Sequence, residues 1–149
     1  MVNFDGVVPA LSQALNKRGY TLLTPVQLAV LAPELKDVDA LVSAQTGSGK
    51  TVAFGLSFAP TLLGLDDRFG RADKVLALVV APTRELALQV KRELDWLYEK
   101  TGASIASCVG GMDIRTERRA LERGVHIVVG TPGRLRDHIE RGSLELTQI

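Results

Sequence analysis

Residues 44–51 read AQTGSGKT and match the spacing GxxxxGK[ST], a pattern that holds phosphate groups. Gly47 and Gly49 let the backbone curl, so that successive N–H groups point at phosphate oxygens. Lys50 would contact the β and γ phosphates, and Thr51 would offer its hydroxyl to a Mg²⁺ ion that bridges them. The other expected contacts are Ala44, Gln45, Thr46 and Ser48. The loop therefore predicts a nucleotide site, and a glycine-rich connection without function is the alternative.

A glutamine upstream could choose the base of that nucleotide. Residues 19–27 read GYTLLTPVQ, a turn that leads into a helical segment. The Gln27 amide has a donor and an acceptor, which can pair with N6 and N7 of adenine and would mismatch guanine. Tyr20 supplies a flat ring for stacking. The residues alone leave open the alternative that the helix simply begins at Thr24-Pro25, with Gln27 in solvent.

Three further segments could hold the phosphates of a nucleic acid. Residues 82–85 (PTRE) and 131–134 (TPGR) each follow a candidate strand, and ligands bind at the carboxyl ends of strands in open α/β sheets. Each segment combines a threonine at a helix start with an arginine. Glycines at 110 and 111 permit close approach of a sugar-phosphate backbone. The expected contacts are Pro82, Thr83, Arg84, Glu85, Gly110, Gly111, Thr131, Pro132, Gly133 and Arg134. Helix caps and a simple turn remain the alternatives.

Short apolar runs alternate with helical patterns, which is typical of βα units around a parallel sheet. We expect strands buried on both faces at residues 40–44, 75–81, 104–109 and 126–130. Apolar residues at helical spacing predict an amphipathic helix over 84–99, and residues 52–63 have helical length and composition. The fold class is therefore α/β, with a parallel sheet and helices on both of its faces.

Composition narrows the class of protein. With 149 residues, of which 46% are hydrophobic and 23% charged, the chain suits one compact domain with a core of its own. A net charge of +1 is too small for binding nucleic acid by bulk charge, so such binding needs local sites. The single cysteine, Cys108, allows no internal disulfide and no Cys/His zinc cluster, and it favours a reducing, cytoplasmic location. No apolar run approaches a membrane span, so we expect no membrane association.

Four arginines fall on one face of the helix expected after residue 111. They are Arg115, Arg118, Arg119 and Arg123. Because Glu117 and Glu122 lie among them, we expect an ordinary solvated face rather than a binding surface.

The order of these motifs resembles the N-terminal RecA-like domain of DEAD-box ATP-dependent RNA helicases, a P-loop NTPase fold. The resemblance runs from Phe4 to about residue 146, and the Q motif at 19–27 separates this family from other helicases that share the phosphate loop. The matching motifs are 19–27 (Q motif), 44–51, 82–87 (PTRELA), 110–111 (GG) and 131–135 (TPGRL). Leu23 departs from the proline usual in that turn.

The resemblance implies a role for each motif. Tyr20 would stack on adenine, Gln27 would read its edge, and Phe4 would brace the pocket. Residues 44–51 would bind ATP with Mg²⁺, and the three later segments would grip one RNA strand without reading its sequence. In such proteins ATP closes two RecA-like domains on single-stranded RNA, strain separates the duplex, and hydrolysis resets the cycle. The implied partners are ATP or ADP, RNA, and a second RecA-like domain absent from residues 1–149.

Hydrolysis needs a carboxylate at the end of an apolar strand, to organise Mg²⁺ and the attacking water. No candidate strand ends in one, and Asp66 and Asp67 are expected to follow a helix instead. In the family resembled, the strand with Asp-Glu-Ala-Asp would come soon after Ile149. That strand and its neighbour lie between the strand before the phosphate loop and the strand leading into PTRELA. We therefore expect that this chain is part of a longer protein and that the chain alone does not hydrolyse ATP.

Two rival functions fit part of the pattern. A non-catalytic module that binds adenine nucleotide, and RNA in addition, would need no carboxylate. An unrelated P-loop ATPase or phosphotransferase would explain residues 44–51 but leave residues 19–27 and 131–135 without a reason.

Overall fold

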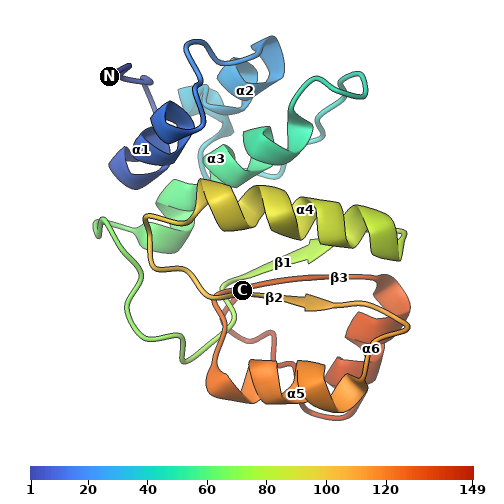
Figure 1. Ribbon diagram of the computed structural model, residues 1–149. Coiled ribbons are helices and arrows are strands. Elements are labelled where there is room, and N and C mark those ends of the chain that lie inside the picture. Colours follow the sequence, from blue (N-terminus) through green and yellow to red (C-terminus); the bar gives the residue numbers. More distant parts are fainter. The chain divides into compact units, whose positions relative to one another are not determined.

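The computed structural model describes residues 1–149, which divide into two compact units (Figure 1). The first unit comprises Met1–Arg68 with Trp96–Thr101, and the second comprises Phe69–Asp95 with Gly102–Ile149. No helix has both the length and the apolar character needed to cross a membrane.

The first unit is helical. It contains α1 (Pro9–Lys17), α2 (Pro25–Val30), the 3₁₀ helix η1 (Pro33–Leu35) and α3 (Lys50–Leu63). Proline opens α1 and α2, where its fixed φ suits the first turn and its missing N–H is not needed. Helix α2 packs against α3. The hydroxyl of the buried Tyr98 donates a hydrogen bond to the Gly55 carbonyl of α3 at 2.6 Å, which ties residues 96–101 into this unit.

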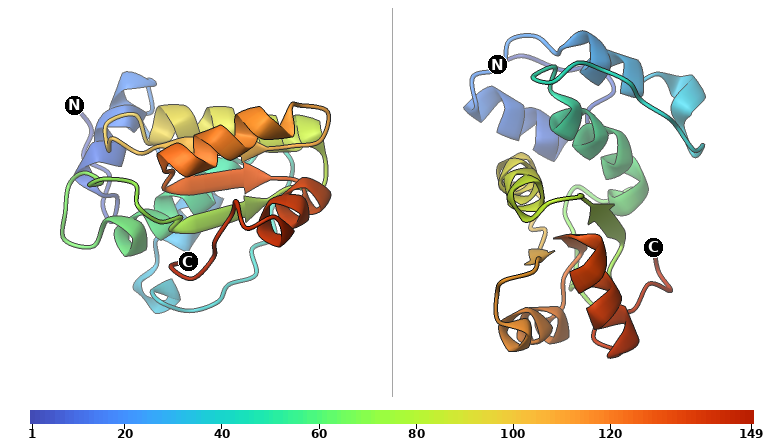
Figure 2. Two further views of the ribbon diagram at one scale, coloured as in Figure 1. Left: turned by 90° about the horizontal axis from the view of Figure 1, so that it is seen from below. Right: turned by 90° about the vertical axis from the view of Figure 1, so that its right-hand side faces the viewer.

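The second unit is a three-stranded parallel sheet with the strand order β1-β3-β2. The strands are β1 (Ala77–Val80), β2 (Ile105–Cys108) and β3 (Ile127–Gly130), and they are followed in turn by α4 (Arg84–Leu97), α5 (Ile114–Arg123) and α6 (Pro132–Glu140). The part of α4 that belongs to this unit covers one face of the sheet, while α5 and α6 cover the other (Figures 1 and 2). The predicted α/β class, with helices on both faces, is confirmed.

The central strand β3 organises the core of this unit. All four of its residues are buried. Val128 lies in one cluster with Leu121 of α5 and Leu135 of α6. Because successive strand residues point to opposite faces, Ile127 and Val129 face the side covered by α4. Burial on both faces, predicted for every strand, is thus confirmed for β3.

In β2 only alternate residues are buried, and the prediction of burial on both faces is wrong for β1. None of its residues is fully buried, and Val80 is 56% exposed. The physical reason is its place at an edge of the sheet, where β3 is its only neighbour.

Residues 40–44 form no strand, so that prediction is also wrong. These residues adopt no regular structure and pair with no strand. Leu41 is fully exposed and Val42 is 42% exposed. An extended segment becomes a strand only when a neighbour accepts and donates its backbone hydrogen bonds, and no neighbour is present here. A short apolar run indicates that a segment can form a strand, but it does not supply the partner.

Candidate functional site

The phosphate loop leads directly into α3, as its sequence predicts. Gly49 occupies the N-cap of α3 in the left-handed region, with φ of 84°, and Gly47 has φ of 81°. The first N–H groups of a helix have no partner within it and carry its positive dipole end. The first turn of α3 holds no acidic side chain that could take this place. This end of α3 can therefore accept an anion.

The side chains of the loop fit a phosphate ligand. The exposed Lys50 donates from Nζ to the Ala44 carbonyl at 2.7 Å, so its ammonium lies across the loop. The hydroxyl of Ser48 is buried and has no hydrogen-bond partner. Thr51, half-buried, lies in the first turn of α3. A phosphate chain would give the orphaned hydroxyl and the lysine better acceptors than the loop itself offers.

Gln27 is not in solvent, so the alternative of a solvated residue is wrong. Its side chain is fully buried. Its Oε1 accepts the N–H of Thr24 at 3.0 Å, and its Nε2 donates to the Gly49 carbonyl at 3.3 Å. Gly49 has a positive φ, and a Cβ there would collide with that Nε2, so a larger residue would displace the Gln27 amide. The Gln27 amide thus joins the start of α2 to the N-cap of α3.

The two aromatic residues assigned to the base pocket have different surroundings. Phe4 is buried in the core of the first unit. Tyr20 is half-buried, and its ring lies 5.9 Å from the ring of Trp96, measured between centroids. The guanidinium of Arg18 lies 4.9 Å from the centre of the Trp96 ring. The sequence patterns used above do not select Trp96 or Arg18, because neither belongs to a motif. A separate cleft of about 500 Å³ beside α2 is lined by neither Tyr20 nor Gln27.

The three segments predicted to hold nucleic acid lie together. Residues 82–85 follow β1, residues 109–112 follow β2 and residues 131–134 follow β3, so all three leave the carboxyl ends of adjacent parallel strands. Eight of the ten predicted contacts are exposed, namely Pro82, Thr83, Arg84, Glu85, Gly110, Gly111, Pro132 and Gly133. The other two are the half-buried Thr131 and Arg134. The motifs are thus adjacent in space as well as ordered in sequence.

Arg84 and Gly111 connect two of these segments. Gly111 has φ of 84°, and a Cβ there would lie 2.5 Å from Nη1 of Arg84. The guanidinium therefore packs on the bare backbone of Gly111. Thr83 caps α4 by accepting the N–H of Leu86 at 3.2 Å, whereas Thr131 occupies the N-cap of α6 without a side-chain hydrogen bond to the helix.

Arg134 turns inward, away from the surface expected for a nucleic-acid ligand. Only 14% of its side chain is exposed. Its Nη1 donates to the Met112 carbonyl at 3.1 Å and to Oε1 of Glu117 at 3.0 Å. The ten predicted contacts therefore divide into nine that reach the surface and one that serves the interior.

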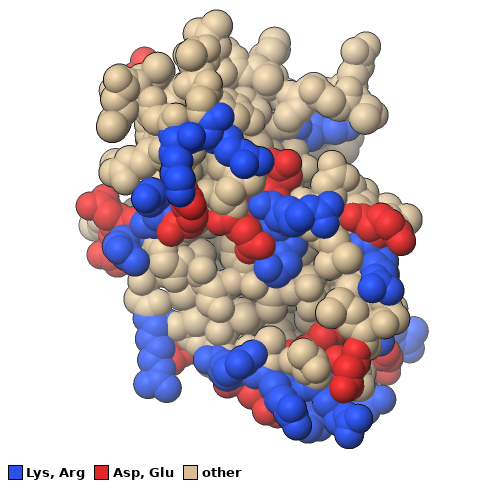
Figure 3. All heavy atoms as spheres, in the orientation of Figure 1, with Lys and Arg blue, Asp and Glu red and all other residues tan.

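Glu117 is the residue that sequence reasoning missed. It is buried, so its placement on a solvated face is wrong. Its Oε2 accepts the N–H of Val109 at 2.8 Å, and its Oε1 lies 2.9 Å from Nε2 of His138. The signal was present in the spacing, because Glu117 precedes the buried Leu121 by four residues and so shares its face. The four arginines of α5 are exposed, as expected, and Figure 3 shows basic side chains gathered over this helix.

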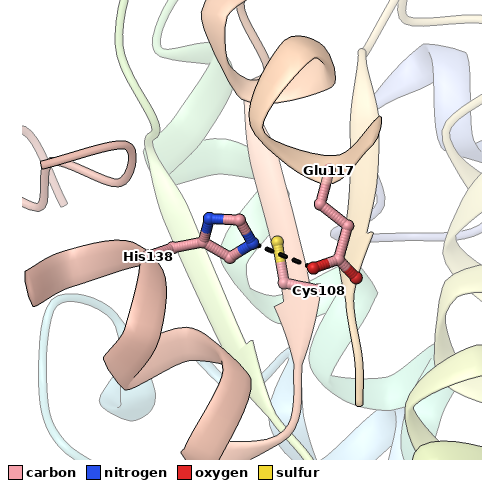
Figure 4. A group of neighbouring side chains, drawn as sticks. All are labelled: Cys108, Glu117 and His138. Carbon is pink, nitrogen blue, oxygen red and sulfur yellow. Dashed lines mark hydrogen bonds and ion pairs between the residues drawn. The ribbon is translucent and has the colours of Figure 1, made fainter. Parts of the chain in front are cut away.

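Cys108, Glu117 and His138 converge from β2, α5 and α6 (Figure 4). Their donor atoms lie within 4.8 Å of one another, and these residue types bind zinc in other proteins. Here the Arg134 guanidinium already supplies the positive charge beside the carboxylate. Burial, together with the charge of Glu117 and partly offset by Arg134, raises the pKa of the Cys108 thiol to about 12. The group is therefore a hydrogen-bonded charge cluster with a protonated thiol.

Comparison with known proteins identifies the family. The model for the DEAD/DEAH box helicase family matches residues 24–149. The chain belongs to the DEAD/DEAH box helicase family. DEAD-box ATP-dependent RNA helicase 3B, chloroplastic, from Zea mays is 46% identical over an alignment of 149 positions that covers 97% of this chain and 19% of that protein. DEAD-box ATP-dependent RNA helicase CshA from Geobacillus kaustophilus is 38% identical over 144 residues, covering 97% of this chain and 30% of that protein.

A solved structure supports the same assignment for this DEAD/DEAH box chain. The crystal structure of a hypothetical ATP-dependent RNA helicase from Sulfolobus tokodaii superposes with a TM-score of 0.79 at 30% identity. The match covers 94% of this chain and 38% of that protein. The family and the fold expected from the motifs are both confirmed, and the chain spans less than a third of the length of the two relatives named above.

Proposed function

We propose that this chain forms the adenine-nucleotide site and part of the RNA-binding surface of an ATP-dependent RNA helicase. The relatives bear that name, and they support the proposal for the whole protein. The observation that carries it is the hydrogen bond from Gln27 to the Gly49 carbonyl. This bond places the amide expected to read a base against the turn expected to hold phosphates.

The phosphates of ATP would lie at the N-terminus of α3. Free N–H groups of the loop and of the first helical turn donate to phosphate oxygens, and Lys50 adds a mobile positive charge. The hydroxyl of Thr51 would be a ligand of Mg²⁺, which when bound would offset the charge of the β and γ phosphates. Phosphate would replace the Ala44 carbonyl as the acceptor of Lys50, so the lysine side chain would no longer cross the loop.

Adenine would be selected through the remaining hydrogen-bonding capacity of Gln27. Its amide uses one N–H on Gly49 and one lone pair on Thr24. A second N–H and a second lone pair remain, and these would suit the N7 acceptor and the N6 amino group of adenine once the base displaces the groups that bury the amide. Guanine has an acceptor at position 6, so it would leave one of these pairings unmade.

RNA would bind across the carboxyl ends of β1, β3 and β2. The exposed guanidinium of Arg84 and the hydroxyl of Thr131 can reach phosphate oxygens, and Gly110 and Gly111 let the sugar-phosphate backbone approach closely. Contacts to phosphate and sugar carry no base information, so binding through them would be independent of sequence. In the whole protein, ATP would close a second RecA-like domain on the bound RNA strand, and hydrolysis would separate the two domains again.

Calorimetric titration with ADP and with GDP, in the presence and absence of Mg²⁺, tests the nucleotide site. We expect ADP to bind, GDP to bind at least tenfold more weakly, and Lys50→Ala to abolish binding. Gln27→Ala should erase the preference for ADP, whereas the exposed matched control Gln13→Ala should retain it. Circular dichroism checks that each variant is folded. Equal affinity for ADP and GDP would favour an unrelated P-loop ATPase, and no binding by folded protein would refute the proposal.

The catalytic part of the proposal concerns the whole protein. RNA should stimulate its ATP hydrolysis, and Lys50→Ala should remove the stimulated rate. Nucleotide and RNA binding without stimulated hydrolysis would instead identify a non-catalytic binding module.

A further inference from the structure

The buried cluster around Glu117 holds both ends of the segment that follows β2. At its start, the Val109 N–H donates to Oε2 of Glu117 at 2.8 Å. At its end, the Met112 carbonyl accepts from Nη1 of Arg134 at 3.1 Å. Since the same Nη1 also donates to Oε1 of Glu117 at 3.0 Å, the carboxylate and the guanidinium close a ring around residues 109–112.

His138 completes this arrangement from α6. It is fully buried, and its Nε2 lies 2.9 Å from the oxygen of Glu117 that Arg134 also contacts. A buried carboxylate is costly unless hydrogen bonds and an opposite charge compensate it. Here the backbone, the guanidinium and the imidazole together provide that compensation. The Glu117 carboxylate is engaged at both oxygens and so rigidifies the elements that it joins, whereas Nδ1 of His138 has no hydrogen-bond partner.

The elements joined are two of the three segments proposed to touch RNA. Arg134 belongs to the first turn of α6, which begins directly after Thr131. Its guanidinium reaches the segment that contains Gly110 and Gly111. Arg84, by contrast, is exposed and lies over Gly111. The two arginines therefore have different surroundings, one in solvent beside the expected RNA path and one inside.

We propose that Glu117, Arg134 and His138 form a positioning clamp, which holds residues 109–112 and the N-terminus of α6 at the spacing that one RNA strand requires. Arg134 acts through this clamp and makes no phosphate contact of its own, whereas Arg84 is the arginine that contacts phosphate. The inference rests on the proposed RNA-binding function.

A variant that changes charge distinguishes a positioning role of Glu117 from an electrostatic effect on RNA affinity. Glu117→Gln removes a negative charge, so bulk electrostatics alone would raise RNA affinity. A clamp predicts the opposite, because the amide group cannot accept at both of its ends. Glu122→Gln makes the same charge change at an exposed position of the same helix and is the matched control.

The experiment measures the fluorescence anisotropy of a labelled single-stranded oligouridylate with the full chain over a series of salt concentrations. Glu117→Gln should weaken binding about 3- to 10-fold, and Glu122→Gln should not weaken it. Arg84→Gln should reduce the slope of log affinity against log salt by about 0.7, the value of one lost phosphate contact to a single strand. Arg134→Gln should weaken binding while leaving that slope unchanged.

Each other outcome overturns the clamp. Unchanged or tighter binding by folded Glu117→Gln would show that the cluster serves stability alone, and a slope reduced by about 0.7 in Arg134→Gln would make Arg134 a phosphate ligand. If Glu117→Gln does not fold, Arg134→Lys tests the same point, because it keeps the charge and removes the planar fork. Absence of RNA binding by the unaltered chain would refute the proposed function itself, which sets that result apart from failure of the clamp.

Discussion

Replacing Gln27 by alanine should destabilise the first unit even when no nucleotide is present. The side chain is fully buried and links two segments that are 22 residues apart in sequence. Alanine would leave the Thr24 N–H and the Gly49 carbonyl without their side-chain partner. It would also leave a small cavity beneath the N-cap of α3.

The expected size follows from these losses. A hydrogen bond of this kind contributes about 0.5–1.5 kcal/mol net, and two are lost. With the cavity included, the free energy of unfolding should fall by about 2–3 kcal/mol. Gln27→Glu should also lower the free energy of unfolding, because its buried carboxylate still accepts from Thr24 but would repel the Gly49 carbonyl instead of donating to it.

Urea unfolding followed by circular dichroism measures this change. Gln13 is an exposed glutamine of α1, and Gln13→Ala should alter the free energy of unfolding by no more than about 0.5 kcal/mol. If Gln27→Ala and Gln13→Ala unfold at the same urea concentration, Gln27 does not join α2 to α3, and the geometric basis of the nucleotide site is wrong.

Four other predictions concern Gly49, Tyr98 and Cys108. Gly49→Ala should weaken ADP binding at least tenfold in calorimetry, because a left-handed alanine costs about 1–2 kcal/mol and its Cβ would displace the Gln27 amide. Tyr98→Phe should lower the free energy of unfolding by about 1 kcal/mol in urea titration, since the buried hydroxyl donates to Gly55 at 2.6 Å. Cys108 should react with a thiol reagent at about pH 8 only after unfolding, because its pKa is raised to about 12. Stability should also fall above pH 9.0, the ordinary pKa of a thiol, because the unfolded thiol then releases its proton while the folded one retains it. Cys108→Ala should reduce this alkaline loss of stability, as measured by thermal melting over a pH series.

Local patterns predicted two helices and two of the strands closely. Length and composition predict the helix after the phosphate loop, and apolar spacing predicts the helix from residue 84; both are present, as α3 and α4. The strands β2 and β3 were located to within two residues at each end. These features succeed because helical hydrogen bonds are made within the segment, and because buried parallel strands are continuous apolar runs.

Features that depend on a partner were predicted less well. Residues 40–44 have the composition of a buried strand, yet no neighbour pairs with them. The sequence predicts a surface ligand at Arg134, because this residue follows a strand and lies near the start of a helix. In the structure, Arg134 lies in the interior beside Glu117, which precedes it by 17 residues and which the sequence places on a solvated face.

The sequence by itself determined the family, the α/β class and the motifs, because glycine conformation, phosphate chemistry and hydrophobic periodicity are properties of short segments. Tertiary structure alone decided which of these residues meet. It placed the amide of Gln27 against the N-cap of α3, brought three segments to one end of a parallel sheet, and turned one of two similar arginines inward. The physical reason is that a buried polar group takes whichever partner the packing provides, and sequence spacing does not encode that partner.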